Sequence, residues 1–249
     1  MTDSRLVVIL GATSAIAQAY ARRRAQAGVR FALAGRGEER LKAVAADLVA
    51  RGAASAEPVV IDLSAIGEIE SAAEMIHARF GPPQEIVVAY GVLGEQAALE
   101  RDLPAARVAL DVNFTSAALW LLAFLKRREA AQPLTAVVIG SVAGDRGRGT
   151  NFIYGAAKGG LDIFVQGLAH AYAGTPARFV MVKPGFVDTP MTAGFLKGGP
   201  LWSSPDRVAA DIERAVRRGA RVVYTPWFWW PIMAIIRRLP WFVFRRLKI

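Results

Sequence analysis

The stretch Leu6-Val-Val-Ile-Leu-Gly-Ala-Thr-Ser-Ala-Ile-Ala17 decides the fold class of this chain. Its first five residues are all apolar, which is typical of a parallel strand buried on both faces. Gly11 then allows a tight turn, and the next segment, Ile16–Ala27, has a helical pattern that ends at Gly28. A strand, a glycine turn and a helix form the first half of a βαβ unit.

Strand-like and helix-like segments continue to alternate along the chain. The further strands that we expect are Val29–Ala34, Val59–Ile61, Ile86–Ala89, Ala136–Gly140, Arg178–Val182 and Arg221–Tyr224. The further helices that we expect are Glu38–Arg51, Ile66–Phe80, Ala105–Ala130, Tyr154–Ala173 and Pro205–Arg218. This alternation predicts an α/β fold: a doubly wound (Rossmann) parallel sheet of about seven strands, with helices on both faces.

No linker rich in Pro, Gly or Ser divides the alternation, so we expect a single domain over residues 1–225. An apolar and basic tail, residues 226–249, follows and is expected to pack on the domain or to lie at a membrane surface. In doubly wound sheets, ligands bind beyond the carboxyl ends of the strands. We therefore look for functional residues in the loops that follow each strand.

The composition excludes several classes of protein. The chain has 249 residues, of which 53% are hydrophobic, so it is not a disordered polypeptide. It has no cysteine, which excludes disulfides, zinc fingers, iron–sulfur clusters and thiol nucleophiles. With only two histidines, no metal site is expected. The net charge is +10, but the basic residues form short scattered clusters, so we expect no nucleic-acid partner.

The turn at residues 11–17 predicts a nucleotide site, because backbone N–H groups at a helix N-terminus bind pyrophosphate. Only Gly11 of a three-glycine pattern is present, and Ala15 and Ala17 occupy the other two positions. Taken alone, the turn fits an ordinary strand-to-helix connection equally well.

The ends of the next two strands indicate which nucleotide. The second strand ends at Gly35-Arg36, without the acidic residue that would bind the ribose 2′-hydroxyl of NAD. Arg36 can instead pair with a 2′-phosphate, which favours NADP(H) over NAD(H), although it fits a solvated loop position too. Asp62 ends the third strand, where it could accept an adenine amino group or cap a helix in competition with Ser64.

Tyr154 and Lys158 are four residues apart at the start of an expected helix, so their side chains project from one face. A phenol with a pKa of about 10 is a poor acid–base catalyst near neutral pH. A neighbouring ammonium group favours the phenolate and makes the pair useful in catalysis. Ser141, at the end of a strand, could hydrogen-bond a substrate oxygen, and Asn113 lies in an expected helix. Individually, Ser141 could be a turn residue and Asn113 a cap.

Together with Lys183-Pro-Gly-Phe-Val-Asp-Thr189, these motifs make the sequence similar to the short-chain dehydrogenase/reductase family over nearly its full length. The resemblance implies hydride transfer between a nicotinamide coenzyme and a carbonyl or secondary alcohol. It implies that Tyr154 is the acid, that Lys158 holds the nicotinamide ribose, that Ser141 orients the substrate and that Asn113 holds a relay water.

The coenzyme contacts that the resemblance implies, besides Tyr154 and Lys158, are Gly11, Thr13, Ser14, Ala15, Ile16, Arg36, Asp62, Leu63, Tyr90, Gly91, Pro184, Gly185, Val187 and Thr189. It also implies a homodimer or homotetramer.

Two departures from the family pattern bear on the coenzyme site. Leu10 stands where the family usually has threonine, and Ala89-Tyr-Gly-Val92 replaces the Asn-Asn-Ala-Gly stretch.

The tail combines interfacial aromatics with cations suited to anionic headgroups. These residues are Trp227, Trp229, Trp230, Trp241 and Phe242, with Arg237, Arg238, Arg245, Arg246 and Lys248. The apolar run Val222–Ile236 is too short, and too interrupted by Pro226 and Pro231, to span a bilayer. The tail therefore predicts peripheral membrane contact, or alternatively a cover for the substrate pocket or a subunit interface.

A narrower resemblance concerns the substrate. The segments Val88–Gly94 and Gly144–Tyr154, and the tail from Tyr224, are similar to reductases of decaprenylphosphoryl 2-keto-erythro-pentose, a lipid-linked keto-sugar. The apolar, Gly-rich segment Phe186–Trp202 is a candidate lid over such a substrate.

Other functions stay open from the sequence. A soluble ketone or keto-acyl reductase fits the same motifs. A non-catalytic nucleotide-sensing or scaffold protein on this fold typically lacks the tyrosine or lysine that this chain keeps. We expect a cytoplasmic protein with a small-molecule substrate, because residues 1–5 lead directly into a strand without signal-peptide features.

Overall fold

The computed structural model describes residues 5–25, 28–196 and 198–247. Its central sheet has seven parallel strands in the order β3-β2-β1-β4-β5-β6-β9. The strands are β1 (Leu6–Leu10), β2 (Arg30–Gly35), β3 (Ser55–Val60), β4 (Glu85–Val88), β5 (Leu134–Ile139), β6 (Ala177–Pro184) and β9 (Val222–Thr225). The chain runs outward from β1 first in one direction and then, from β4, in the other. This order confirms the doubly wound fold and places a ligand crevice at the carboxyl ends of β1 and β4.

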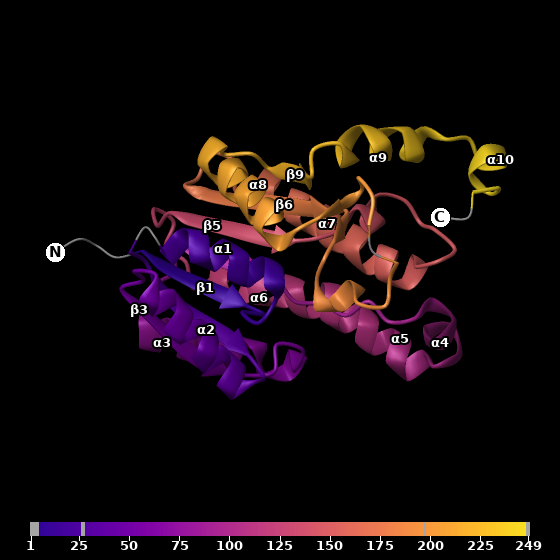
Figure 1. Ribbon diagram of the computed structural model, residues 1–249. Coiled ribbons are helices and arrows are strands. Elements are labelled where there is room, and N and C mark those ends of the chain that lie inside the picture. Colours follow the sequence, from indigo (N-terminus) through magenta and orange to yellow (C-terminus); the bar gives the residue numbers. More distant parts are fainter. Residues whose placement is uncertain (1–4, 26–27, 197, 248–249) are drawn as a thin grey trace.

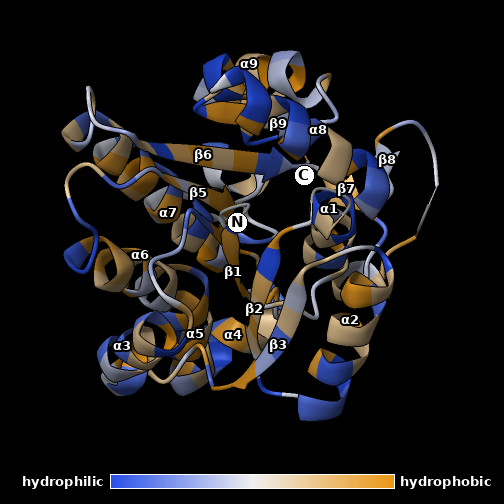
Figure 2. Ribbon diagram, turned by 90° about the vertical axis from the view of Figure 1, so that its left-hand side faces the viewer, coloured by the Kyte–Doolittle hydropathy of each residue, from blue (hydrophilic) through white to orange (hydrophobic). Residues whose placement is uncertain are grey.

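Helices cover both faces of the sheet, as Figures 1 and 2 show. One face packs against α1 (Ala15–Ala25), α2 (Glu38–Ala50) and α8 (Pro205–Arg218). The other packs against α3 (Ile69–Phe80), α6 (Ser116–Lys126) and α7 (Phe152–Ala171). Strand β1 is buried throughout because its alternating side chains enter both layers: Val7 and Ile9 face α1, whereas Val8 and Leu10 face the α6 side.

Capping residues in the sequence explain why the predicted ends of helix α8 agree with the structure. Helix α8 begins at the predicted Pro205 because Ser204 caps it, accepting a hydrogen bond from the Arg207 backbone N–H at 3.2 Å. It ends at Arg218 because Gly219 adopts a left-handed conformation. Helix α1 is described as far as Ala25, and the last predicted residues, 26–27, lie outside the described part of the chain.

The predicted helix Ala105–Ala130 is wrong in its boundaries and in its continuity. It starts at Leu103 and ends at Lys126, and it consists of α5 (Leu103–Leu110), the π-helical turn η2 (Asp111–Thr115) and α6. A short helix that the sequence analysis missed, α4 (Gln96–Arg101), precedes it. The whole stretch is long and apolar enough to cross a membrane, but more than half of its most apolar window is buried against the sheet, so we assign it to the core.

After β6 the chain forms a small two-stranded ladder, β7 (Phe186–Val187) with β8 (Trp202–Ser203), around the 3-10 turn η4 (Pro190–Thr192). This is the segment predicted as a lid. Phe186 stacks on Trp202 with ring centres 5.5 Å apart, so the base of the segment is tied together. Its outer part exposes apolar side chains, Met191, Phe195, Leu196 and Leu201.

The last 22 described residues, 226–247, form what we call the C-terminal arm, with helices α9 (Trp229–Arg238) and α10 (Trp241–Phe244). In Figure 1 the arm leaves β9 and runs along the side of the molecule at the carboxyl ends of the strands, with α10 at its far end. Trp229 and Met233 bury the inner face of α9 against Val142. The inner face of α9 therefore packs on the domain.

Candidate active site

Helix α7 carries the central pair of the candidate site. Tyr154 and Lys158 lie on the same face of its first turns, and both are buried, with exposed fractions of 9% and 4%. The Lys158 Nζ atom lies 5.8 Å from the centre of the Tyr154 ring and donates a hydrogen bond to the Ile139 carbonyl at 3.2 Å. An ammonium group has three donors, so this contact leaves others for ribose hydroxyls.

Burial shifts the pKa of both groups. It raises the pKa of the Tyr154 phenol to about 12, although hydrogen bonding with the Ser141 hydroxyl counteracts part of the rise. It lowers the pKa of the Lys158 ammonium to about 8. At neutral pH the phenol is therefore protonated, and most of the lysine is charged. That is the protonation state required of a proton donor with a cationic neighbour.

Ser141 follows β5 and caps the 3-10 turn η3 (Val142–Asp145), where its hydroxyl oxygen accepts from the Ala143 backbone N–H at 3.1 Å. This turn lies against α7, and glycines make the approach possible. A Cβ atom on Gly144 would lie 2.7 Å from the backbone nitrogen of Gly159. The serine and the tyrosine–lysine pair are thus brought together by a close backbone contact.

Asn113 lies in the π-helical turn η2, and its buried side chain anchors the loop after β4. Its Nδ2 atom donates to the carbonyls of Val92 at 2.7 Å and Ala109 at 2.8 Å, and its Oδ1 atom accepts from the Val92 N–H at 3.2 Å. A Cβ atom on Gly91 would lie 2.5 Å from Asn113 Oδ1 and 3.5 Å from Lys158 Nζ. Asn113 and Lys158 therefore both lie close to Gly91. Single π-helical turns such as η2 are frequent at functional sites.

The glycine turn after β1 has the geometry of a phosphate-binding loop. Gly11 has φ +89°, and a Cβ atom there would lie 2.8 Å from the Cβ of Tyr90, so only glycine fits. The N–H groups of Gly11 and Ala12 donate to the Ala34 carbonyl, which ties the turn to β2. Helix α1 begins at Ala15 without an acidic residue in its first turn, so its N-terminus attracts an anion.

The predicted loop residues divide by exposure. Thr13, Ser14 and Ala15 are partly exposed and can meet a ligand with side chain and backbone, whereas the Ile16 side chain is buried in the core. Leu63, in the loop after β3, is buried too, and its carbonyl accepts from the Trp120 indole at 3.1 Å. Ile16 and Leu63 therefore offer a ligand only backbone groups.

Arg36 and Asp62 lie at the carboxyl ends of β2 and β3. Hydrogen bonds from Ser64 lower the pKa of the Asp62 carboxyl, and the nearby Arg36 charge lowers it further. Asp62 Oδ1 accepts from the Ser64 backbone N–H at 2.9 Å and from its hydroxyl at 2.7 Å. The alternative that Asp62 or Ser64 caps a helix is wrong, because the helical turn that follows begins at Ile66 with Ala65 before it and no side-chain cap.

Tyr90 replaces a polar residue of the family pattern and is held in place by Ser116, with 2.9 Å between the two hydroxyl oxygens. Burial raises the pKa of the Tyr90 phenol. On the other side of the site, Pro184 and Val187 are buried, Gly185 and Thr189 are partly exposed, and the Thr192 hydroxyl donates to the Val187 carbonyl at 2.7 Å. This hydrogen bond ties the segment after β6 to its own 3-10 turn, η4.

Three features of the site were missed by sequence reasoning. Arg40, in the first turn of α2, lines a surface cavity of about 260 Å³ together with Thr13 and Gln18. The signal available in the sequence was a second arginine only four residues after Arg36. The second feature is the indole of Trp229, which lies across Gly185, where an added Cβ would be 1.9 Å from the ring. The third is a buried ion-pair cluster around Lys183, whose Nζ lies 2.7 Å from both Asp145 and Asp162.

Among the residues that the structure describes, no three His, Asp or Glu side chains are grouped to hold a metal ion. A glycine turn at the carboxyl end of β1 and a buried tyrosine–lysine pair on a doubly wound sheet are features expected of a nucleotide-dependent oxidoreductase. The comparisons with known proteins agree with this class. A family model described as short chain dehydrogenase matches residues 5–198.

Relatives support the same assignment, and solved structures share the fold. An uncharacterized oxidoreductase of Mycobacterium tuberculosis is 38% identical over 246 residues, covering 99% of this chain and 98% of that protein. A 3-oxoacyl-[acyl-carrier-protein] reductase of Bos taurus is 29% identical over 188 residues, covering 76% and 78%. An actinorhodin polyketide ketoreductase variant with NADPH superposes with TM-score 0.77 and 24% identity, over 90% of this chain and 96% of that one.

A short-chain dehydrogenase/reductase from Burkholderia phymatum in complex with NAD superposes with TM-score 0.81 and 20% identity, over 93% of this chain and 92% of that one. The chain belongs to the short-chain dehydrogenase/reductase family. It is an oxidoreductase with a nucleotide-binding Rossmann fold, and structures of the same fold hold NADPH or NAD.

Proposed function

We propose that this protein is an NADP(H)-dependent reductase that interconverts a carbonyl and a secondary alcohol by hydride transfer. The observation that carries the proposal is the buried pair of Tyr154 and Lys158 beside Ser141. Gly91 lies close to Lys158, and its neighbour Tyr90 packs on Gly11 of the glycine turn. Burial holds the pKa of the phenol at about 12 and that of the ammonium at about 8. A chain that used this fold only to sense or bind a nucleotide would not need that arrangement.

The coenzyme, when bound, supplies or accepts the hydride. The residues of this chain do the rest. Ser141 donates a hydrogen bond to the substrate oxygen and orients the carbonyl. Tyr154 gives its phenolic proton to that oxygen as negative charge develops on it, and the positive charge of Lys158 stabilises the resulting phenolate. Asn113 holds the loop at Gly91 against Lys158, and by the family resemblance it also supports a water that returns the proton.

Two arginines support the NADP(H) preference: Arg36 in the loop after β2, and Arg40 in the first turn of α2. Arg36 is exposed at the end of β2, and Arg40 lines the cavity that Thr13 of the glycine turn shares. Guanidinium groups bind phosphate oxygens in bidentate fashion. We propose that both arginines hold the 2′-phosphate, that Asp62 lies near the adenine and that NAD(H) binds more weakly. The other predicted contacts, from Gly11 to Thr189, keep the roles that the family resemblance gives them.

For the substrate we propose an amphipathic ketone, and among these a lipid-linked keto-sugar. The support is the apolar wall beside the site, where Trp229 packs on Gly185 and lies edge-on to Phe186 with ring centres 5.7 Å apart. The competing substrate class is a soluble ketone or keto-acyl compound, which the similarity to a 3-oxoacyl reductase favours. We propose that the enzyme works in the cytoplasm, where NADPH is available.

We also propose a homo-oligomer, a dimer or tetramer. Helices α5 and α7 lie side by side, and they expose large apolar side chains at Leu103, Val108 and Ile163. Exposed apolar patches of this kind mark protein interfaces. The residues 1–225 form the catalytic domain in this proposal, and the arm is an addition to it.

The test of catalysis is Tyr154→Phe, which removes only the phenolic hydroxyl. We expect NADPH-dependent reduction of a panel of ketones to fall by at least about a hundredfold, while NADPH binding measured by fluorescence stays within about twofold. A protein that binds NADPH but reduces no ketone, with or without the substitution, would support the non-catalytic alternative instead.

A further inference from the structure

The net positive charge of this protein is concentrated at its C-terminal end, although basic residues occur along the whole chain. Nine of its 31 basic residues follow Glu213, the last acidic residue, so the last 36 residues carry nine of the ten net positive charges. Four of these cations, Arg237, Arg238, Arg245 and Arg246, are exposed on the C-terminal arm. The arm itself contains no carboxylate, so nothing within it neutralises them.

The arm presents two different faces. On α9, the side chains that contact the domain are Trp229, Ile232, Met233 and Ile236, which recur at three- and four-residue spacing. At 100° per residue, Arg238 falls opposite this inner face, and Trp230 and Ile235 fall on either side of Arg238, turned away from the domain. Trp230 and Ile235 are 60% and 64% exposed. The apolar character of the outer face is therefore not explained by packing within the chain.

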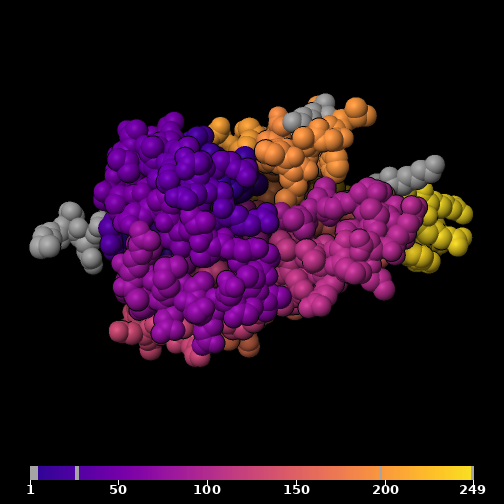
Figure 3. Space-filling view, turned by 90° about the horizontal axis from the view of Figure 1, so that it is seen from below, coloured from indigo at the N-terminus to yellow at the C-terminus, as the bar shows by residue number. Residues whose placement is uncertain are grey.

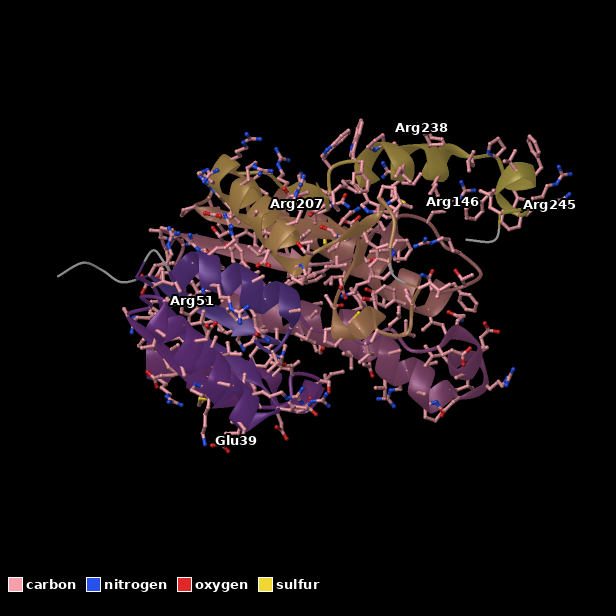
Figure 4. The ribbon with its side chains drawn as sticks, viewed as in Figure 1. Glu39, Arg51, Arg146, Arg207, Arg238 and Arg245 are labelled. Carbon is pink, nitrogen blue, oxygen red and sulfur yellow. The ribbon has the colours of Figure 1, made fainter. Side chains whose placement is uncertain are left out.

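The same combination continues along the arm. Trp227 precedes α9 and is 69% exposed, and on α10 Trp241 and Phe242 are 69% and 61% exposed. Figure 4 shows Arg238 and Arg245 on the arm, and Arg146 between the arm and the body of the molecule. In the view from below in Figure 3, the far end of the arm protrudes past the region of α4 and α5. Large aromatics and arginines thus share one projecting surface.

The inner face connects this surface to the active site. Trp229 packs against Val142, the residue after Ser141, and against Gly185, one residue beyond β6. Arg146, five residues after Ser141, donates hydrogen bonds to the carbonyls of Ile236 and Leu239, and the latter is 2.8 Å long. Whatever the outer face binds will therefore lie on the side of the molecule that carries the turn after Ser141 and the segment after β6.

We propose that the outer face of the C-terminal arm docks on an anionic lipid bilayer. Charge complementarity selects this partner over a second copy of the chain, because an arm that carries only positive charge repels its own copy and attracts anionic headgroups. Exposed tryptophan and phenylalanine insert at the level of the headgroups, where their amphipathic rings are favoured. The docked arm holds the active-site entrance at the lipid surface, where an amphipathic ketone can be reached. This last step rests on the proposed function, whereas the docking itself does not.

The experiment is co-sedimentation of the full chain with vesicles of phosphatidylcholine alone and with added phosphatidylglycerol. Arg237→Glu/Arg238→Glu changes the arm, and Arg217→Glu/Arg218→Glu is the matched control, with the same change of net charge at the end of α8 away from the arm. We expect binding to the anionic vesicles only, and a loss of at least about tenfold in partitioning for the arm variant but less than about twofold for the control.

A second readout tests insertion of the aromatics. Brominated lipids quench tryptophan only at short range, so they should quench the wild type and have little effect on Trp227→Phe/Trp230→Phe/Trp241→Phe, in which the arm keeps only the buried Trp229. Circular dichroism and NADPH binding show that each variant is folded. Equal loss of vesicle binding in both charge variants, absence of quenching, or an arm-dependent self-association without vesicle binding would each overturn the proposal.

Separate measurements can contradict the docking proposal without contradicting the proposed function, and the reverse. Reduction of a short, water-soluble ketone by NADPH is measured on the same preparations without vesicles. Vesicle binding without any reductase activity contradicts the proposed function and leaves the docking intact. Reductase activity that survives in all variants, with no vesicle binding in the wild type, contradicts the docking alone.

Discussion

The guanidinium carbon of Arg146 lies 3.7 Å from the centre of the Phe244 ring, which joins the turn after Ser141 to the last helix of the chain. The same guanidinium reaches the carbonyls of Ile236 and Leu239 at the end of α9. One side chain thus hydrogen-bonds two carbonyls at the end of α9, and it also stacks on an aromatic ring.

Replacement of Arg146 by alanine should therefore release the arm without unfolding the domain. Hydrogen bonds to charged groups contribute about 1.5–3 kcal/mol, so a loss of about 2 kcal/mol corresponds to roughly thirtyfold faster amide exchange in residues 229–244. Hydrogen–deuterium exchange measures this directly. Arg146→Lys keeps the charge but not the planar fork and should give an intermediate effect. Unchanged exchange in Arg146→Ala would show that the apolar contacts alone hold the arm.

The lowered pKa of Lys158 predicts how coenzyme binding depends on pH. Its charged form holds the ribose in the proposed mechanism, and its pKa of about 8 in the folded protein means that the charge is lost as the pH rises through 8. NADPH affinity should therefore be constant from pH 6.5 to 7.5 and should weaken above pH 8. Fluorescence titration between pH 6.5 and 9.5 tests this, and Lys158→Met should bind weakly at every pH without the transition.

The same shift has an opposite consequence for stability. Because the folded pKa of Lys158 lies below the value of about 10.4 for a free lysine, the unfolded chain binds more protons between pH 8 and pH 10. The contribution of this residue to the free energy of unfolding consequently rises with pH in that window. Lys158→Met should remove this rise, and urea unfolding at pH 7.5 and 9.5 would detect it as a difference between variant and wild type.

Coenzyme preference should depend on Arg36 and Arg40. If both guanidinium groups hold a 2′-phosphate, Arg36→Ala/Arg40→Ala should weaken NADPH binding by about 3 kcal/mol, or roughly a hundredfold, and leave NADH binding nearly unchanged. Each single variant should lose part of this preference. Calorimetric titration with the two coenzymes gives the ratio of their affinities. An equal loss of affinity for NADPH and NADH would mean that the arginines do not bind the 2′-phosphate.

The ion-pair cluster around Lys183 should be important for stability. Burial lowers the pKa of this lysine, but hydrogen bonds to Asp145 and Asp162 outweigh burial and raise it overall. Lys183→Met leaves the two carboxylates without their partner and should cost roughly 3–5 kcal/mol in the free energy of unfolding. Chemical denaturation measures the loss. The triple variant Lys183→Met/Asp145→Asn/Asp162→Asn should lose less, since no unpaired charge remains; a larger loss would contradict this account.

Oligomerisation should depend on the exposed apolar residues of α5 and α7. Ile163 is 72% exposed, and Ile163→Glu would place a charge in the proposed interface. Light scattering after gel filtration should show a smaller species than the wild type. Val49→Glu, on α2 at the opposite face of the sheet, is the control and should leave the mass unchanged. A wild type that elutes as a monomer would contradict the oligomer directly.

Much of this protein can be deduced from its sequence, because the deciding signals are local. Five apolar residues followed by Gly11 are sufficient to predict β1 and the turn after it. Ser204, Pro205 and Gly219 mark both ends of α8, and the spacing of Tyr154 and Lys158 on a helix predicts that they face the same way. These inferences need only the periods of helices and strands and the conformational freedom of glycine.

Other features depend on contacts between distant segments, and only the tertiary structure decides them. The π-turn that brings Asn113 to Gly91 interrupts a sequence that reads as a continuous helix, since its driving contacts come from the loop after β4. The pKa values of Tyr154 and Lys158 follow from burial by elements far along the chain. The sequence leaves open whether the tail packs inward or projects, whereas the fold gives α9 a buried face on Val142 and an exposed face with Trp230. Composition alone cannot assign those faces, because the residues that bury one of them lie about 90 positions earlier in the chain.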